Sequence, residues 1–236
     1  IVKFADGDPV DTPLIEHAAM TLSRPANIRA AETMPIKLVD GHAVAIKRFD
    51  RVGHRRVHAL SANVALKAVA EELGYPELAL LLRRRGVGDG GINREQMREL
   101  FRRMVFNILL DNTDDHEKNH AVLVNAAQEY ALAPAYDVLP SGQALGFQQM
   151  RVGEHEADAT LDNALSMARL FALDDRLALA EARKVAAVVA RWKEHFAACG
   201  VRQRDIEAYA EQIDRPFLRE QRESLRPRIA VTRIVR

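Results

Sequence analysis

The sequence contains a single cysteine, no long apolar run and almost no net charge. Cys199 has no second cysteine with which to form an internal disulfide, which is typical of proteins of the reducing cytoplasm. The 34 basic and 33 acidic side chains give a formal net charge of +1, so the overall charge favours neither nucleic acid nor a membrane surface as a partner. No apolar stretch is long enough for a membrane span or a signal peptide. These absences predict a soluble, cytoplasmic protein with no membrane partner.

The composition predicts a globular chain with a sizeable core. Of its 236 residues, 48% are hydrophobic and 28% are charged, which is enough for one large domain or two lobes. Repeats and low-complexity linkers are absent, so a third domain is not expected. The chain begins with Ile1 rather than Met, and its first residues resemble the middle of a strand. We therefore expect further residues to precede it, including any loop that covers a bound phosphate.

The hydrophobic patterns change near residue 57. Before this point, Thr12 and Pro13 predict the N-cap and first residue of a helix, and residues 36–49 predict two strands joined by a turn at Gly41. After it the pattern is mostly helical, and residues 93–96 resemble a capping box that opens a helix. Helices are expected over residues 61–73, 77–85, 93–108, 163–172, 175–198 and 203–223, and a hairpin from strands 121–124 and 130–132.

The turn-like stretch after the helix at residues 93–108 contains the most informative motif. Asp114 and Asn119 have the D-x-x-x-x-N spacing of a kinase catalytic loop, in which the aspartate accepts the proton of the attacking hydroxyl and the asparagine holds Mg²⁺. Beyond the predicted hairpin, Asp137 offers another oxygen ligand of the kind that Mg²⁺ prefers. The pattern predicts a phosphoryl-transfer centre made by these three residues.

Two residues near the start of the chain fit the same chemistry. Lys3 lies in a strand-like apolar segment, and Glu16 lies on the helix that follows. Protein kinases use a strand lysine, paired with a helix glutamate, to contact the nucleotide phosphates. A lone strand lysine is most often an ordinary edge residue. The ordered set of lysine, glutamate, loop motif and a later aspartate is what favours a kinase.

A zinc hydrolase is an alternative interpretation of the same stretch. His116, Glu117 and His120 match H-E-x-x-H, which binds zinc when both histidines lie on one face of a helix. The residues before this motif are typical of a turn and those after it of a strand, so a helix is not expected. No third ligand has a diagnostic spacing. We expect His116 instead to support the catalytic loop through hydrogen bonds.

Five segments of the chain share the pattern of one family. The two most specific contain the loop motif and the later aspartate, and the others contain the lysine strand, the glutamate helix and a strand that ends in R-F-D-R. They are residues 106–120, 132–140, 1–4, 14–20 and 45–51. Together they resemble the HipA family of serine/threonine kinase toxins, and the resemblance extends over most of the chain.

The resemblance implies a role for each matching residue in the reaction centre. It makes Asp114 the catalytic aspartate and makes Asn119 and Asp137 the Mg²⁺ ligands. Lys3, with Glu16 beside it, would contact the phosphates of ATP.

On the adenine side, the resemblance implies contacts with the backbone around Lys47 and Phe49. His116 and Tyr136 would support the site. The best-known member of the family has glutamate at the position of Lys47. A backbone contact would tolerate this change, whereas a side-chain contact would not.

The resemblance also implies a fold, a reaction and partners. The fold would be α+β and two-lobed like a protein kinase, with residues 1–57 as the remainder of a nucleotide-binding lobe and residues 58–236 as a helical lobe. The reaction would transfer the γ-phosphoryl group of Mg-ATP to a serine or threonine of a translation factor or an aminoacyl-tRNA synthetase. A HipB-like helix-turn-helix antitoxin would neutralise the toxin and make most of the DNA contact. A non-catalytic module that only binds such an antitoxin is the remaining alternative.

Overall fold

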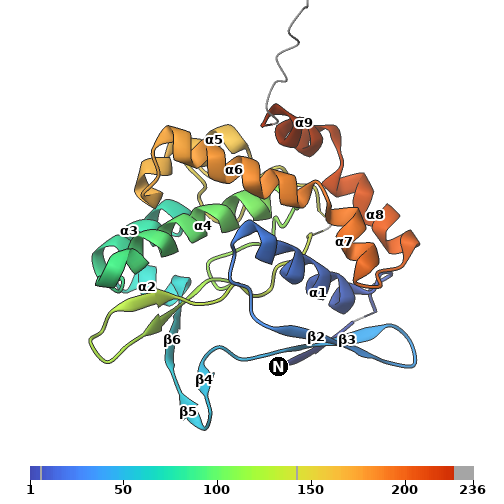
Figure 1. Ribbon diagram of the computed structural model, residues 1–236, viewed down its shortest axis with the longest axis horizontal. Coiled ribbons are helices and arrows are strands. Elements are labelled where there is room, and N and C mark those ends of the chain that lie inside the picture. The colour runs from blue at the N-terminus through green and yellow to red at the C-terminus, as the bar shows by residue number, and fades with distance from the viewer. Residues whose placement is uncertain (6, 142, 226–236) are drawn as a thin grey trace, which may run out of the picture.

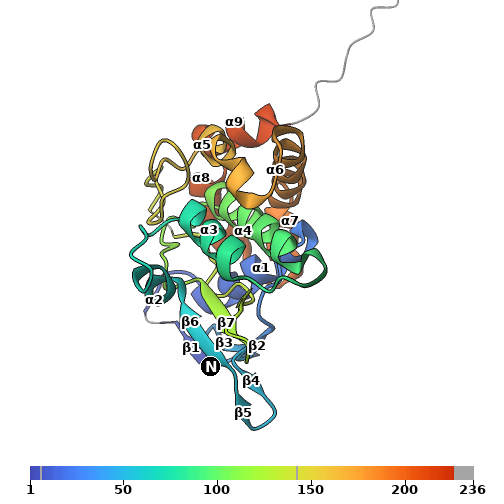
Figure 2. The same ribbon diagram turned by 90° about the vertical axis from the view of Figure 1, so that its left-hand side faces the viewer.

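Small antiparallel sheets lie on one side of the molecule, and helices form the rest of it (Figure 1). The structure is a computed structural model that describes residues 1–5, 7–141 and 143–225. The turned view shows the same separation, with the strands at one end and the helices stacked above them (Figure 2). This arrangement is the mixed α+β fold expected from the sequence.

The first sheet places Lys3 on the face that a helix covers. Strands β1 (Val2–Phe4), β3 (His42–Ile46) and β2 (Thr33–Lys37) pair antiparallel in that order. Lys3 pairs with the fully buried Val44 of β3, so both side chains point to the same face. Helix α1 (Thr12–Ser23) packs on this sheet through contacts with β2 and β3. The predicted strands and their turn at Gly41 are confirmed.

The remaining strands bring the middle of the chain beside the first sheet. A short hairpin, β4 (Arg51–Val52) and β5 (Arg55–Arg56), leads into a second three-stranded sheet. That sheet has the order β6 (His58–Ser61), β7 (Ala121–Val124) and β8 (Tyr130–Leu132), so strands about sixty residues apart in sequence are neighbours. The hairpin predicted at residues 121–132 is confirmed with these boundaries.

The helical part is built around one long buried helix. Helix α4 (Ile92–Leu109) packs against α3 (Tyr75–Arg85), α5 (Leu161–Ser166) and α6 (Asp175–Val189). Its apolar side chains Phe101, Met104 and Ile108 are buried. The other helices of the described chain are α2 (Ala62–Lys67), α3 (Tyr75–Arg85), α5 (Leu161–Ser166), α6 (Asp175–Val189), α7 (Trp192–Ala198), α8 (Gln203–Ile213) and α9 (Pro216–Ser224), with 3₁₀ turns at Arg24–Ala26, Asp89–Gly91 and Ala168–Phe171.

Both predicted helix caps differ from the structure. Thr12 is the first residue of α1 rather than its N-cap, and its hydroxyl donates to the Asp8 carboxylate at 2.6 Å. Helix α4 begins after Gly91, which has a φ of 83° that glycine adopts without strain. The side chain of Asn93 therefore does not cap the helix and instead donates to the Arg83 carbonyl.

Four predicted helices are shorter than expected. The one expected over residues 163–172 ends at Ser166 and is followed by the 3₁₀ turn Ala168–Phe171. The helix predicted to reach residue 73 ends at Lys67, and Ala70 has a φ of 57°, which an α-helix cannot accommodate. The helix expected over residues 175–198 is interrupted between Val189 and Trp192. The one expected over residues 203–223 is interrupted before Pro216, whose ring starts a new helix.

One hydrophobic core connects the sheet side with the helical side. Ile15 of α1 and Val44 of β3 belong to the same buried cluster as Phe101 of α4 and Trp192 of α7. The domain boundary at residue 57 stays a prediction, since one core contains residues from both sides of it. Among the described residues, no helix has the length and apolar character needed to cross a membrane.

Candidate active site

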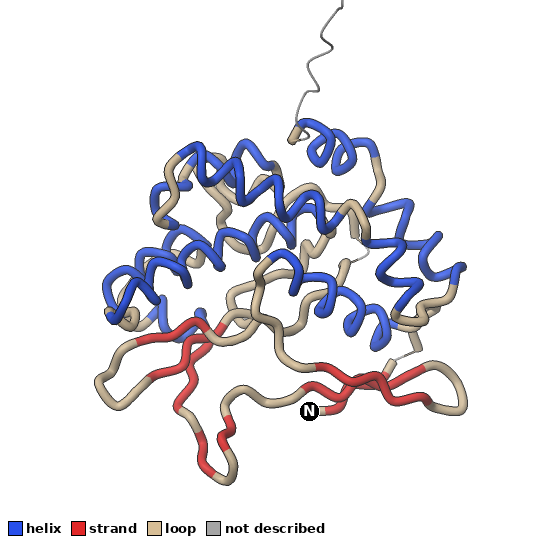
Figure 3. The backbone as a smooth tube through the Cα atoms, viewed as in Figure 1, coloured by secondary structure: helices blue, strands red, loops and turns tan. Residues whose placement is uncertain are grey.

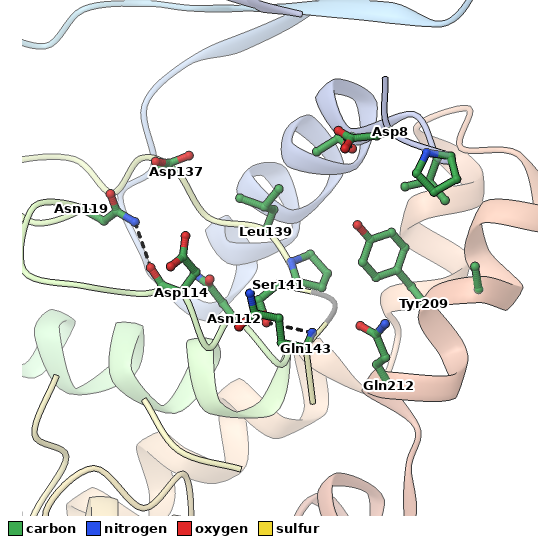
Figure 4. Close-up of a pocket in the computed structure, with 15 residues that line it drawn as sticks. Asp8, Asn112, Asp114, Asn119, Asp137, Leu139, Ser141, Gln143, Tyr209 and Gln212 are labelled. Carbon is green, nitrogen blue, oxygen red and sulfur yellow. Dashed lines mark hydrogen bonds between the residues drawn. The ribbon is translucent and has the colours of Figure 1, made fainter. Parts of the chain in front are cut away.

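The predicted catalytic and metal-binding side chains line one cleft. Asp114, Asn119 and Asp137 are on its wall, and the cleft has a volume of about 520 Å³ (Figure 4). Helix α8 forms the opposite wall with Tyr209 and neighbouring residues. Asp114 is exposed to solvent, so a hydroxyl group can approach its carboxylate.

The catalytic loop starts where α4 ends, because the backbone turns sharply at Asp111. This residue has a φ of 61°, and the next backbone N–H, that of Asn112, donates back to the Asn107 carbonyl at 2.9 Å. Residues 112–120 then form turns rather than a helix, as the tube drawing shows by the loop that follows α4 (Figure 3). Arg215 pairs with Asp111 at 3.0 Å and so ties the loop to the C-terminal helices.

Two buried side chains, those of Asp115 and His120, hold the two ends of this loop together. His120 Nε2 lies 3.0 Å from Oδ1 of Asp115, and both residues are almost fully buried. The hydroxyl of Tyr75 donates to the same carboxylate, and the Asn107 amide donates to that hydroxyl at 3.1 Å. We call Asp115 and His120 the loop clamp. It joins the residue after Asp114 to the residue after Asn119.

The electrostatics of the loop clamp keep its carboxylate ionised. Burial alone would raise the pKa of Asp115, but the interactions with His120 and the hydroxyl of Tyr75 bring that pKa below its ordinary value. A buried carboxylate costs free energy unless hydrogen bonds and a charge partner compensate for the lost water. Asp115 and Tyr75 were not expected at the site from the sequence, and His120 was expected there only as an alternative zinc ligand. The contact between residues 75 and 115 is non-local, so no local pattern signals it.

Asn119 is held with its amide oxygen away from the loop backbone. Its backbone N–H donates to the His116 carbonyl at 2.9 Å, and its side-chain Nδ2 donates to the Asp114 carbonyl at 3.4 Å. The amide oxygen is turned away from Asp114 (Figure 4). This leaves one amide oxygen and the Asp137 carboxylate on the wall of the same cleft, which is an oxygen donor set suited to Mg²⁺.

Lys3 lies between two carboxylates, those of Glu16 and Asp137. Its ammonium group donates to Glu16 at 2.8 Å, which confirms the predicted pair, and it also donates to Asp137. Burial alone would lower the pKa of Lys3, but the two carboxylates raise it above its ordinary value. Burial and the negative charge of Asp137 raise the pKa of Glu16 above its ordinary value, although the ammonium group of Lys3 lowers it. The lysine is therefore firmly charged.

A network beneath β8 fixes the segment that presents Asp137. Glu99 pairs with Arg29 at 2.7 Å and also with the buried Arg103, both on the same carboxylate. Arg103 donates to the Ala133 carbonyl at 2.7 Å, and Arg29 donates to the Leu132 carbonyl at 2.9 Å. Because the backbone after β8 is bound at successive carbonyls, the chain reaches Asp137 in a defined direction.

A second pocket of about 410 Å³ adjoins the cleft. Its lining includes Lys3, Phe49, Tyr136 and Asp137. The rings of Phe49 and Tyr136 have centroids 5.4 Å apart, and the Tyr136 hydroxyl donates to the Lys118 carbonyl at 2.6 Å. Burial raises the pKa of Tyr136 to about 12, so its hydroxyl stays protonated as a donor.

Lys47 contributes to this pocket, but its charged end is engaged elsewhere. Its side chain is 69% exposed, and its ammonium group lies 3.0 Å from the Glu32 carboxylate. The backbone N–H of Lys47 also donates to the Glu32 carbonyl at 2.9 Å. Glu32 therefore engages both the ammonium group and the backbone N–H of Lys47.

His116 does not brace the loop in the way expected from the sequence. Its Nδ1 is buried without a hydrogen-bond partner among the described residues, and only its backbone carbonyl serves the loop. The bracing interaction belongs to His120, whose imidazole reaches Asp115 because the chain reverses direction between them.

The zinc interpretation requires a helix that is absent from this stretch. Residues 116–120 form turns, so His116 and His120 do not share a helix face. In the described part of the chain, no three His, Cys, Asp or Glu side chains are grouped closely enough to hold a metal ion. The H-E-x-x-H match is therefore a coincidence of the loop sequence.

Comparison with known proteins identifies the family. The model of the HipA-like C-terminal domain matches residues 1–214. The chain belongs to this family. Among curated proteins, the one named "Putative kinase Y4dM" from Sinorhizobium fredii (strain NBRC 101917 / NGR234) is 29% identical over 151 residues. That match covers 59% of this chain and 36% of Y4dM.

Two solved structures share the fold of this HipA-like domain. HipA from Shewanella oneidensis MR-1, in a complex with HipB and operator DNA, has a TM-score of 0.70 at 16% identity and is matched over 94% of this chain and 57% of its own length. The proinflammatory kinase CtkA of Helicobacter pylori has a TM-score of 0.54 at 13% identity over 95% of this chain and 90% of its own. The chain thus has a kinase-like fold and spans little more than half of the HipA structure.

Proposed function

We propose that this HipA-like domain is a protein kinase that transfers the γ-phosphoryl group of ATP to a serine or threonine hydroxyl. One observation carries the proposal: Asp114, Asn119 and Asp137 line one cleft, and Asp137 also contacts Lys3 at the border of the second pocket. A kinase needs these elements together, because its catalysis consists mainly of positioning and charge stabilisation.

The residues divide the reaction between them. Lys3, fixed by Glu16, would hold the phosphates of ATP, and the pocket at Phe49 and Tyr136 would take the adenine. Asp114 would orient the acceptor hydroxyl and receive its proton. The acceptor oxygen forms a bond to the γ-phosphorus while the bond from that phosphorus to the β–γ bridging oxygen breaks, and ADP leaves with the electron pair of that bond.

Asn119 and Asp137 fit the role of magnesium ligands. The Asn119 amide oxygen and the second carboxylate oxygen of Asp137 are not used by the interactions that fix these side chains. A bound Mg²⁺ would neutralise charge that develops on the phosphate oxygens. Lys3 already neutralises part of the charge of Asp137, so a metal would change the balance between these two groups.

Substitution of Asp114 tests the proposed reaction. Asp114→Asn removes the proton acceptor but keeps the side-chain size, so we expect phosphoryl transfer from labelled ATP to fall by about 10²–10⁴-fold. ATP affinity, measured by calorimetry, should stay within about threefold because the aspartate does not belong to the adenine pocket. Undiminished transfer by Asp114→Asn would refute the assignment.

We also propose a toxin role, with a HipB-like helix-turn-helix protein as antitoxin and a translation factor or aminoacyl-tRNA synthetase as substrate in the cytoplasm. The similarity of the fold to a HipA that is assembled with HipB and operator DNA supports it. Growth of a bacterial host that expresses either protein is the test. Wild type should slow growth and Asp114→Asn should not, and equal growth of both would contradict a toxin that acts by phosphorylation.

A further inference from the structure

The two pockets meet at a single residue. Within the described chain, Asp137 alone lines both the 410 Å³ pocket at Lys3 and the 520 Å³ cleft at Asp114. If ATP occupies the 410 Å³ pocket, its γ-phosphate reaches towards Asp137, and the acceptor hydroxyl has to arrive from the cleft. The walls of the cleft are therefore in a position to select the acceptor.

The charge of the cleft is of one sign. Its described lining contains the carboxylates of Asp8, Asp114 and Asp137 but no lysine or arginine. Asp114 and Asp137 are committed to the reaction. Asp8 is an exposed residue on the segment before α1, and the Thr12 hydroxyl donates to one of its carboxylate oxygens at 2.6 Å. Its charge is thus available at the mouth of the cleft.

A tyrosine lies opposite the catalytic loop. Tyr209 projects from α8 into the cleft with its hydroxyl on the side of Asp8 (Figure 4). This hydroxyl makes no hydrogen bond with any described residue. Burial raises the pKa of Tyr209 to about 12, and the negative charges of Asp8 and Asp205 act in the same direction. A protonated donor and an aromatic ring therefore face the space beside Asp114.

We propose that this cleft binds an extended segment of the protein substrate that carries a lysine or arginine next to the acceptor serine or threonine. Asp8 pairs with the cation, and the ring of Tyr209 packs against the aliphatic stem and attracts its charge. Charge complementarity at such a rim governs specificity more than affinity. This inference rests on the kinase function proposed above and adds the chemistry of its substrate.

Two peptides that differ at one position test the proposal. Both contain one serine, flanked by lysine in the first and by glutamate in the second, and kcat/KM for phosphorylation is compared with Mg-ATP. Wild type should prefer the lysine peptide by about tenfold, the size of a favourable exposed ion pair plus a cation–π contact. Asp8→Lys should reverse the preference, and Tyr209→Ala should reduce it.

Control variants separate this effect from general loss of charge or of folding. Asp162→Lys makes the same charge change on the exposed face of α5, away from the cleft lining, and should keep the wild-type preference. Tyr209→Phe should keep the ring-dependent part of the preference. Circular dichroism confirms that each variant is folded.

The outcomes distinguish this proposal from the kinase proposal. Equal kcat/KM for both peptides in wild type, or an unchanged preference in Asp8→Lys, would overturn the acceptor assignment and leave the kinase function standing. No transfer to either peptide, combined with no label on any protein of a cell extract, would overturn the kinase function and this inference with it.

Discussion

Lys3 shows how one residue depends on its surroundings for a function. A strand lysine is ordinarily an edge residue in solvent, but this one lies on the face covered by α1 and is held by Glu16 and Asp137. Glu16 is only 3% exposed, so it would be an unpaired buried charge without the lysine. Burial of this charge pair costs free energy, and the nucleotide-binding role proposed for Lys3 gives a reason for it.

Replacement of this lysine should weaken nucleotide binding. In Lys3→Met, we expect the Kd for ATP to rise at least about tenfold, because a hydrogen bond to a charged group contributes about 1.5–3 kcal/mol. Lys37→Met is the matched control, since Lys37 is an exposed strand residue of the same sheet. Calorimetry measures both. An equal Kd for Lys3→Met and wild type would contradict the phosphate-binding role.

At the scale of elements, the catalytic loop depends on contacts from distant parts of the chain. Tyr75 at the start of α3 holds Asp115, and Asp115 holds His120. The Asn107 amide near the end of α4 donates to the Tyr75 hydroxyl. The loop clamp thereby fixes the ends of the D-x-x-x-x-N motif without touching the cleft. We regard its two residues as positioning residues.

Asp115→Asn should damage catalysis more than nucleotide binding. We expect kcat to fall at least about tenfold, with the KM for ATP nearly unchanged, because Asp114 loses its fixed position while the pocket at Lys3 stays intact. Lys118→Ala, on the exposed side of the same loop, is the control. A variant with normal kcat would show that the loop clamp is merely structural.

The same variant has a pH signature. The pKa of Asp115 in the folded protein is lower than its ordinary value of 3.8, so its charge stabilises the fold fully above about pH 3.8 and loses this effect as the pH falls through the folded pKa. The stability lost in Asp115→Asn, about 2 kcal/mol at neutral pH, should therefore shrink below pH 3.8. Denaturant unfolding of wild type and Asp115→Asn at neutral pH and below pH 3.8 measures this stability difference. A difference that is the same at the two pH values would argue against an ionised Asp115.

Local patterns predicted the elements better than their ends. The strands at residues 121–124 and 130–132 were predictable because alternation and turn residues are encoded within a few positions. The hydrogen bonds of Thr12 and Asn93 at the helix starts were not predictable from local patterns. Their actual partners, the Asp8 carboxylate and the Arg83 carbonyl, depend on how the chain is folded around them. The helix break at Ala70 has no local signal, whereas the break before Pro216 does, because a proline ring disfavours helical backbone at the residue before it.

The candidate site divides in the same way. The spacing of Asp114 and Asn119, and the sequence order of Lys3, Glu16 and Asp137, indicated the reacting groups. The interactions that hold these groups in place, such as that of Tyr75 with Asp115, could not be predicted from local patterns, because they join residues that are far apart in sequence. His116 was expected to support the loop through hydrogen bonds, but the histidine side chain that bonds within the loop is that of His120, which reaches Asp115 after the chain turns back.

At the scale of the whole molecule, the two pockets organise the function. One lies between the first sheet, with the loop after β3, and strands β6 and β7. The other lies between the catalytic loop and α8, and Asp137 stands at their border. The family match covers residues 1–214 and therefore includes both walls. A kinase-like fold with one shared acidic residue between two pockets predicts that nucleotide binding and metal binding are coupled through Asp137.

The most direct test of this account is the Mg²⁺ dependence of ATP binding in wild type and Asp137→Asn, measured by calorimetry, with Asp162→Asn as the control on α5. The account predicts that Mg²⁺ tightens ATP binding in wild type and in the control, and that Asp137→Asn loses most of this gain. ATP binding in wild type that is unaffected by Mg²⁺, or a gain that survives in Asp137→Asn, would contradict it.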